Sequence, residues 1–211
     1  NDEEVQFTPG ANGVVTLPIF EDVKHDYHIK VIFEKNVSSV LVHHYLKDRN
    51  GNLTTASLAE DGHYQGKIGS DYSTSPKTEI EINGVKYNIA KSINNTGYEV
   101  VGNYALPKNR SGKYVATQTV VTYYYEEQTF NLTVHHYLEG TETSLEPDEI
   151  TNNLYKDNTF ETNIKNELLE EYDLVSGATT VNLDSSDYTI DEETQKVTGT
   201  VTTKDILETL E

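Results

Sequence analysis

The chain of 211 residues contains no cysteine, methionine or tryptophan. The absence of cysteine excludes disulfide bonds, thiol chemistry and zinc sites built on thiolates. The sequence also has no apolar run near the roughly 20 residues that cross a bilayer, and no signal peptide opens it. We therefore expect no membrane insertion in this chain, and we expect any export or anchoring signal to lie outside it.

Basic residues are scarce, because 16 Lys and Arg face 35 Asp and Glu, for a net charge of −19. This field repels a phosphate backbone and an anionic membrane surface, so we expect no nucleic-acid partner. A large surplus of one charge favours a soluble monomer. The charge therefore fits an extracellular protein.

Hydrophobic residues make up only 35% of the chain, yet tyrosine is abundant, with 15 Tyr against 5 Phe. Tyrosine, valine, isoleucine and threonine fit a half-buried pleated sheet. The composition predicts a β-rich protein with thin cores.

One pentapeptide, VHHYL, occurs twice, at 42–46 and at 134–138. Further features follow it in the same order in each half, with variable spacing that places the insertions in loops. These features are Gly97–Gly102, Gly112–Thr117 and Val120–Tyr123 in the first half, and Glu171–Gly177 and Val197–Thr202 in the second. The pattern predicts two diverged copies of one module, at 38–127 and 128–211. Residues 1–37 are interpreted as the C-terminal strands of an upstream repeat or as a docked N-terminal segment.

Both copies of the pentapeptide alternate as a strand whose two faces differ in polarity. The more apolar face is predicted to point to the core, and it comprises Val40, Val42, His44 and Leu46 in the first copy and Leu132, Val134, His136 and Leu138 in the second. The opposite face carries His43, Tyr45, His135 and Tyr137. Neighbouring histidines of a strand point apart, so His43 and His44 cannot bind one metal ion together.

Several local signals place further elements along the chain. Asn-Gly pairs at 50–51 and 83–84 predict tight turns, and residues 163–172 predict a short helix capped by Asn163. A closing strand is predicted at 114–126, matched by one at 197–206. Short linkers are predicted at 36–38 and 126–128, and linkers this short indicate modules arranged head to tail as an elongated rod.

The order of these motifs resembles the mucin-binding-protein (MucBP) repeat of Gram-positive cell-surface proteins. The resemblance is carried by Val42–Leu46, Gly97–Val101 and Val120–Tyr125 in the first copy, and by Val134–Gly140 and Tyr172–Val175 in the second. It implies a β-rich α+β fold of tandem β-grasp-like modules with mostly antiparallel sheets. It also implies a wall-anchored adhesin that binds host mucin or other glycoprotein glycans. The second copy departs from the family pattern because it ends at 204–208 without a final Tyr-rich strand.

No enzyme motif is present: the chain lacks a nucleophile elbow, a P-loop, an HExxH pair and a dinucleotide fingerprint. We therefore expect no catalytic activity, and no cofactor or resident metal. The acidic loops at 48–52 and 184–191 offer oxygen ligands for calcium, but they lack the six to eight ligands of a complete site. These loops are interpreted as polar turns.

Tyrosine is the residue type best suited to ligand contact, since its ring offers a sugar an apolar face and its hydroxyl a hydrogen bond. The candidate ligand-binding residues are Tyr45, His43, Tyr137, His135 and Tyr124. The alternative is that these tyrosines only pack the sheet. The repeats would then be a structural stalk that presents a distal domain.

Overall fold

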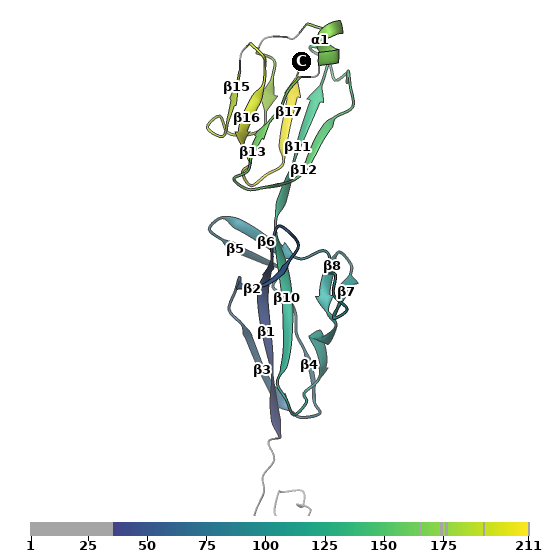
Figure 1. Ribbon diagram of the computed structural model, residues 1–211, viewed down its shortest axis with the longest axis vertical. Coiled ribbons are helices and arrows are strands. Elements are labelled where there is room, and N and C mark those ends of the chain that lie inside the picture. The colour runs from purple at the N-terminus through teal and green to yellow at the C-terminus, as the bar shows by residue number, and fades with distance from the viewer. Residues whose placement is uncertain (1–35, 165, 174, 176, 192, 211) are drawn as a thin grey trace, which may run out of the picture. The chain divides into compact units, whose positions relative to one another are not determined.

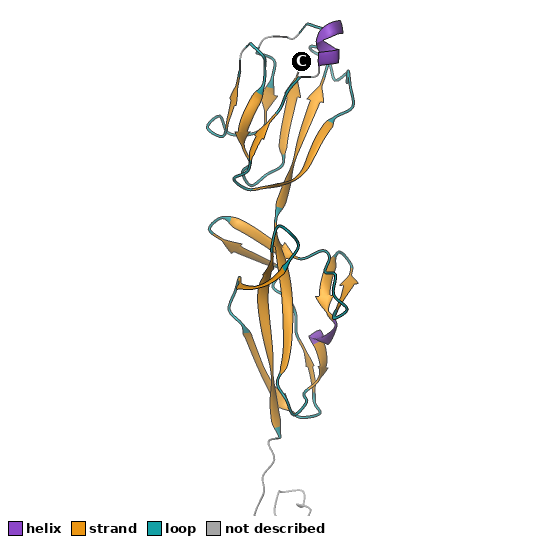
Figure 2. Cartoon of the chain, in the orientation of Figure 1, coloured by secondary structure: helices purple, strands orange, loops and turns teal. Residues whose placement is uncertain are grey.

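The computed structural model describes residues 36–164, 166–173, 175, 177–191 and 193–210. The chain divides into two units, Asn1–Lys35 and Asn36–Glu211, and only the second falls within the described residues. The segment predicted as the end of an upstream repeat therefore lies outside them, apart from residues 36 and 37. The described part is mostly β-strand with very little helix, as the fold class predicted (Figure 1 and Figure 2).

The first module is built around β1, which contains the first VHHYL motif. This strand lies beside β10 in parallel and beside β2 and β3 in antiparallel fashion, while β10 continues the sheet to β6 and β5. The strands of this sheet are β1 (Val37–Lys47), β2 (Leu53–Ser57), β3 (Gly62–Lys67), β5 (Glu79–Ile82), β6 (Val85–Ile89) and β10 (Thr119–Glu127).

Two small two-stranded sheets and one short 3₁₀ helix complete the first module. Strand β4 pairs with β9, and β7 pairs with β8, both antiparallel. These elements are β4 (Asp71–Ser73), β7 (Tyr98–Val101), β8 (Tyr104–Pro107), η1 (Lys108–Arg110) and β9 (Ser111–Lys113).

The second module contains a four-stranded and a three-stranded sheet. The order is β12-β11-β17-β14 in the first and β13-β16-β15 in the second, and β11 and β17 run parallel. The elements are β11 (Thr129–His136), β12 (Glu149–Tyr155), β13 (Thr159–Glu161), α1 (Asn166–Glu171), β14 (Thr180–Val181), β15 (Tyr188–Ile190), β16 (Val197–Thr200) and β17 (Ile206–Leu210).

The two VHHYL strands occupy the same place in their sheets. Val42 lies opposite Val121 on a parallel neighbour and opposite Gly62 on an antiparallel one. Val134 lies opposite Glu208 on a parallel neighbour and opposite Glu149 on an antiparallel one. Each motif therefore sits in a central strand, with a parallel partner on one side and an antiparallel partner on the other.

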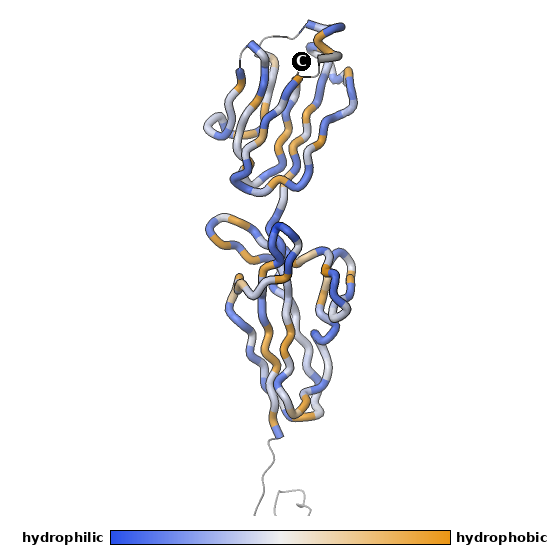
Figure 3. Tube along the Cα trace, in the orientation of Figure 1, coloured by the Kyte–Doolittle hydropathy of each residue, from blue (hydrophilic) through white to orange (hydrophobic). Residues whose placement is uncertain are grey.

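Alternate residues of the central strands fill the two cores, as the sequence predicted. Figure 3 shows the hydropathy of the residues along these strands. The first core gathers around Val40, Val42, Val121, Tyr123 and Tyr125, and the second around Phe130, Leu132, Val134, Val197 and Ile206. His44 and His136 are both buried on this face. Leu138 was predicted to be buried but is 43% exposed, because β11 ends at His136 and the chain turns between Leu138 and Thr141.

Both Asn-Gly turns are confirmed. Ile82 lies opposite Val85, and the two residues between them have φ angles of 53° at Asn83 and 74° at Gly84. Gly51 has a φ of 85° in the turn that joins β1 to β2. At Asn83–Gly84 the Asn-Gly pair is favoured because both central positions of that turn have left-handed backbone angles.

Several predicted boundaries are wrong. The closing strand begins at Thr119 rather than at residue 114, and the stretch 197–206 is divided between β16 and β17, which lie in different sheets. The true counterpart of β10 is β17, which occupies its place without its tyrosines. The segment 126–128 is not a linker, because β10 extends to Glu127 and β11 begins at Thr129.

The helix prediction is confirmed in kind but not in length. The helix α1 spans only Asn166–Glu171, so Asn163 lies too far upstream to be its N-cap. The described residues of the range 171–177 contain no strand, in contrast with the β7 strand to which this range was matched. In the second module β14 pairs with β17 as β6 pairs with β10 in the first, and among the described residues no further strand pairs with β14 as β5 pairs with β6.

Candidate functional site

The outer face of β1 carries a stacked pair of rings, His43 and Tyr45, which we call the first pair. Residues two apart on a strand point to the same side, and here the two ring centroids lie 4.7 Å apart with 12° between their planes. The imidazole is held by a carboxylate, because Nδ1 of His43 lies 2.9 Å from Oδ1 of Asp61. The ring orientation is thus fixed from two directions.

The outer face of the second module carries the same arrangement, His135 and Tyr137, which we call the second pair. The ring centroids are 5.4 Å apart and the planes differ by 9°. Nδ1 of His135 lies 2.5 Å from Oδ1 of Asp148. Four of the five predicted ligand residues are therefore brought together in two matching pairs.

The two aspartates are equivalent in the fold although they are not equivalent in the sequence. Asp61 immediately precedes Gly62, the antiparallel partner of Val42, and Asp148 immediately precedes Glu149, the antiparallel partner of Val134. The intervening chain is longer in the first module than in the second. Strand pairing, and not a fixed spacing in the sequence, brings each carboxylate to its histidine. Neither aspartate was therefore predicted from the sequence.

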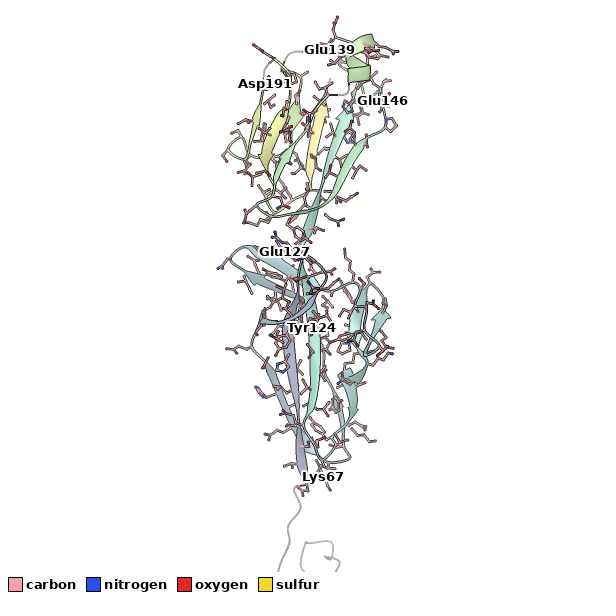
Figure 4. All side chains as sticks on the ribbon, in the orientation of Figure 1. Lys67, Tyr124, Glu127, Glu139, Glu146 and Asp191 are labelled. Carbon is pink, nitrogen blue, oxygen red and sulfur yellow. The ribbon has the colours of Figure 1, made fainter. Side chains whose placement is uncertain are left out.

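Tyr124, the fifth predicted residue, which is labelled in Figure 4, extends the first pair into a row of four rings. Its centroid lies 6.4 Å from that of Tyr45 and 5.9 Å from that of Tyr98 on β7. The hydroxyl of Tyr98 donates to the carbonyl of Thr122, 2.9 Å away, and fixes the far end of the row. Burial, and then the neighbouring Tyr124, raises the pKa of Tyr98 well above its ordinary value.

The second pair has a different surrounding. In the described chain no further ring stacks on Tyr137, and a cavity of about 170 Å³ opens beside it instead. The walls of this cavity are largely apolar and include Leu138, Leu168, Leu169 and Tyr172. The first pair therefore has more aromatic neighbours, whereas the second pair has a cavity beside it.

His44 points to the opposite side of β1 and is not part of this surface. Nδ1 of His44 lies 2.8 Å from the hydroxyl of Tyr125 inside the first core. Burial, followed by the charge of Lys77, lowers the pKa of His44 and so favours the neutral ring. His44 is thus a packing residue, as predicted from strand alternation.

The acidic loops use their oxygens to hold turns. Asp48 accepts hydrogen bonds from the backbone N–H groups of Asn50 and Asn52, and these bonds, together with that from the Asn52 amide, lower its pKa. Asp191 accepts from Glu193 and Thr194 in the same manner. Throughout the residues that the structure describes, no group of three or more acidic or histidine side chains is arranged to hold a metal ion.

Residues 39–126 match the family model of the MucBP domain. The match covers the first module. MucBP domains belong to Gram-positive cell-surface proteins, and the match supports an adhesin-like surface repeat for this part of the chain.

Two solved structures resemble the chain distantly. One is described as Streptococcal High Identity Repeats in Tandem (SHIRT) domains 3–4 from a cell surface protein, with 13% identity over 82% of this chain and 96% of that chain, and a TM-score of 0.32. The other is the crystal structure of Mub-RV, with 12% identity over 82% of this chain and 98% of that chain, and a TM-score of 0.18. No curated protein is significantly similar to the chain. Within the described residues, no helix has the length and apolarity needed to cross a membrane.

Proposed function

We propose that the chain is a non-catalytic adhesin fragment that binds sugars of mucin-type glycoproteins through the first and second pairs. The observation that supports this most is the repetition of the whole arrangement. Each module presents a histidine stacked on a tyrosine and fastened to an aspartate, although the loops that supply the aspartates differ. In this proposal the parent protein is anchored to the bacterial cell wall through regions outside this chain.

The geometry of the pairs suits a sugar ring. A tyrosine ring offers an apolar face to the C–H groups of a sugar, and the ordered ring loses little rotamer freedom on binding. The aspartate beside each pair offers carboxylate oxygens to sugar hydroxyl groups. The stacking and the histidine contact hold both groups in place before the ligand arrives, which lowers the entropic cost of binding.

The test compares binding of the intact chain and three variants to an immobilised mucin glycoprotein. Tyr45→Ala and Tyr137→Ala each remove one stacking ring, and the double variant removes both. Loss of an aromatic contact of about 1 kcal/mol weakens a site roughly fivefold. We expect a several-fold loss in each single variant and a larger loss in the double variant.

Tyr104→Ala is the matched control, because Tyr104 is an exposed tyrosine on β8 that belongs to neither pair. Circular dichroism verifies that each variant is folded. Binding of the double variant equal to that of the Tyr104 control would refute the assignment of the site. If the unaltered chain does not bind the glycoprotein at high concentration, the observation instead favours the stalk function.

A further inference from the structure

The charged side chains that contact the two pairs are acidic, unlike those of a site that binds acidic ligands. Each pair is bordered by one aspartate, whose side chain is 34% exposed at Asp61 and 40% exposed at Asp148. A carboxylate has about four acceptor positions on its two oxygens. Only one close contact to the histidine is used in each case, so each aspartate retains capacity to accept hydrogen bonds from a ligand.

The cation nearest to the first pair along its strand is already neutralised. Lys47 follows Tyr45 on the same face of β1, but its Nζ lies 2.8 Å from Oε2 of Glu126 on β10. Both side chains are largely buried. An anionic ligand could bind Lys47 only by breaking this ion pair. The carboxylate of Glu126 would then be unpaired and would repel the ligand.

The second pair lies in a segment without any cation. Residues 128–155 contain neither lysine nor arginine, and they contain five acidic residues, Glu139, Glu142, Glu146, Asp148 and Glu149. Two of these, Glu139 and Glu146, are labelled in Figure 4. Glu139 also lines the cavity beside Tyr137, together with Asp173. The next lysine, Lys156, is bonded to Asp157.

We propose that both pairs select uncharged sugars and reject sugars that carry a carboxylate or a sulfate group. This inference rests on the proposed function. Uncharged sugars donate hydroxyl hydrogens to Asp61 and Asp148, whereas an anionic group on the same stacked ring lies beside a carboxylate. Two like charges about 6 Å apart repel by an amount equal to roughly threefold in affinity in water and about a hundredfold at the dielectric of a protein surface.

The discrimination is stronger at the second pair. There the acidic residues of the segment 128–155 add to Asp148, while at the first pair Lys47 and Glu126 cancel each other. Mobile ions screen the more distant charges at physiological salt. The contributions of Asp148, which contacts His135, and of Glu139, which lines the cavity together with Tyr137, therefore matter most.

The experiment measures binding of the intact chain to one mucin glycoprotein before and after sialidase treatment, and to paired neutral and sialylated oligosaccharides. We expect removal of sialic acid to strengthen binding threefold or more, with a smaller effect at high salt. Equal or tighter binding of the sialylated forms would overturn the inference and leave the proposed function in place. Absence of binding to every form would overturn the proposed function itself.

A variant series locates the source of the selectivity. Asp148→Asn in a Tyr45→Ala background isolates the second pair, removes the charge and keeps an oxygen and an amide to face His135. We expect the preference for the neutral form, measured as the ratio of the affinities for the neutral and the sialylated oligosaccharide, to fall severalfold. Glu81→Gln, an exposed carboxylate on β5, is the control and should leave the preference unchanged. An unchanged preference in the Asp148 variant would show that this carboxylate does not select the ligand.

Discussion

A buried carboxyl group in the second module leads to a sharp prediction about stability and pH. Glu208 is 0% exposed and stands where the first module has Val121, since the two residues face the corresponding valines of the VHHYL strands. Oε1 of Glu208 accepts a hydrogen bond from the hydroxyl of Thr162, 3.0 Å away. Glu149 flanks Val134 from the other side, and His136 lies on the same face of β11.

Burial raises the pKa of Glu208 from 4.5 to about 7, with the hydrogen bond from Thr162 opposing the change and the charge of Glu149 adding to it. Between these two values the folded protein holds a proton that the unfolded chain has released. The stability that the folded module gains from keeping Glu208 neutral is therefore fully present below pH 4.5. It is lost as the pH rises towards and through 7. At ~1.4 kcal/mol for each tenfold change in proton affinity, ionisation costs the second module about 3 kcal/mol.

Glu208→Gln removes the ionisation and keeps an oxygen for the Thr162 hydroxyl. We expect the variant and the unaltered chain to have similar unfolding free energies near pH 5. At pH 8 the variant should be more stable by about 2 to 3 kcal/mol. Urea unfolding followed by circular dichroism measures both values, and carbon NMR of the side-chain carboxyl group measures the pKa directly. Glu142→Gln, an exposed residue of the same module, serves as the control.

Two results would refute this reasoning. A stability difference below about 0.5 kcal/mol at pH 8 would mean that the folded module accommodates the carboxylate at almost no cost, within the scatter of surface substitutions. An NMR pKa below about 5 would show directly that Glu208 is ionised in the folded state at neutral pH.

Three further predictions concern the first module. Tyr125→Phe removes a buried hydroxyl that accepts the Lys77 N–H at 2.9 Å and contacts His44, and urea unfolding should show a loss of about 1 to 3 kcal/mol. Gly66→Ala places a Cβ 2.3 Å from the Tyr114 ring, so thermal unfolding should occur several degrees earlier, as expected for overpacking of about 1 to 3 kcal/mol. Gly84→Ala meets no neighbouring atom but must hold a φ of 74°, and it should cost about 1 kcal/mol through the backbone alone. Equal stability of either alanine variant and the unaltered chain would contradict the structural reason given for that glycine.

Local patterns predicted those features that depend on neighbours in the chain. The alternation around VHHYL placed His44 and His136 in the cores because the side-chain period of a strand is two. The Asn83–Gly84 turn was predictable because its backbone angles depend on those two residues alone. The boundaries failed where the pattern is ambiguous, as at 197–206, whose alternating residues are compatible with one strand or with two.

The sequence by itself determined the β-rich class, the repeated VHHYL strand with its buried and exposed faces, and the four histidine and tyrosine residues of the two pairs. Only the tertiary structure decided that Asp61 and Asp148 complete the pairs, that Tyr98 extends the first one, and that β17 rather than residues 197–206 is the counterpart of β10. The physical reason is that strand pairing joins residues across loops of different length. A local periodicity predicts to which side of a strand a side chain points. It does not predict which distant strand lies beside that strand.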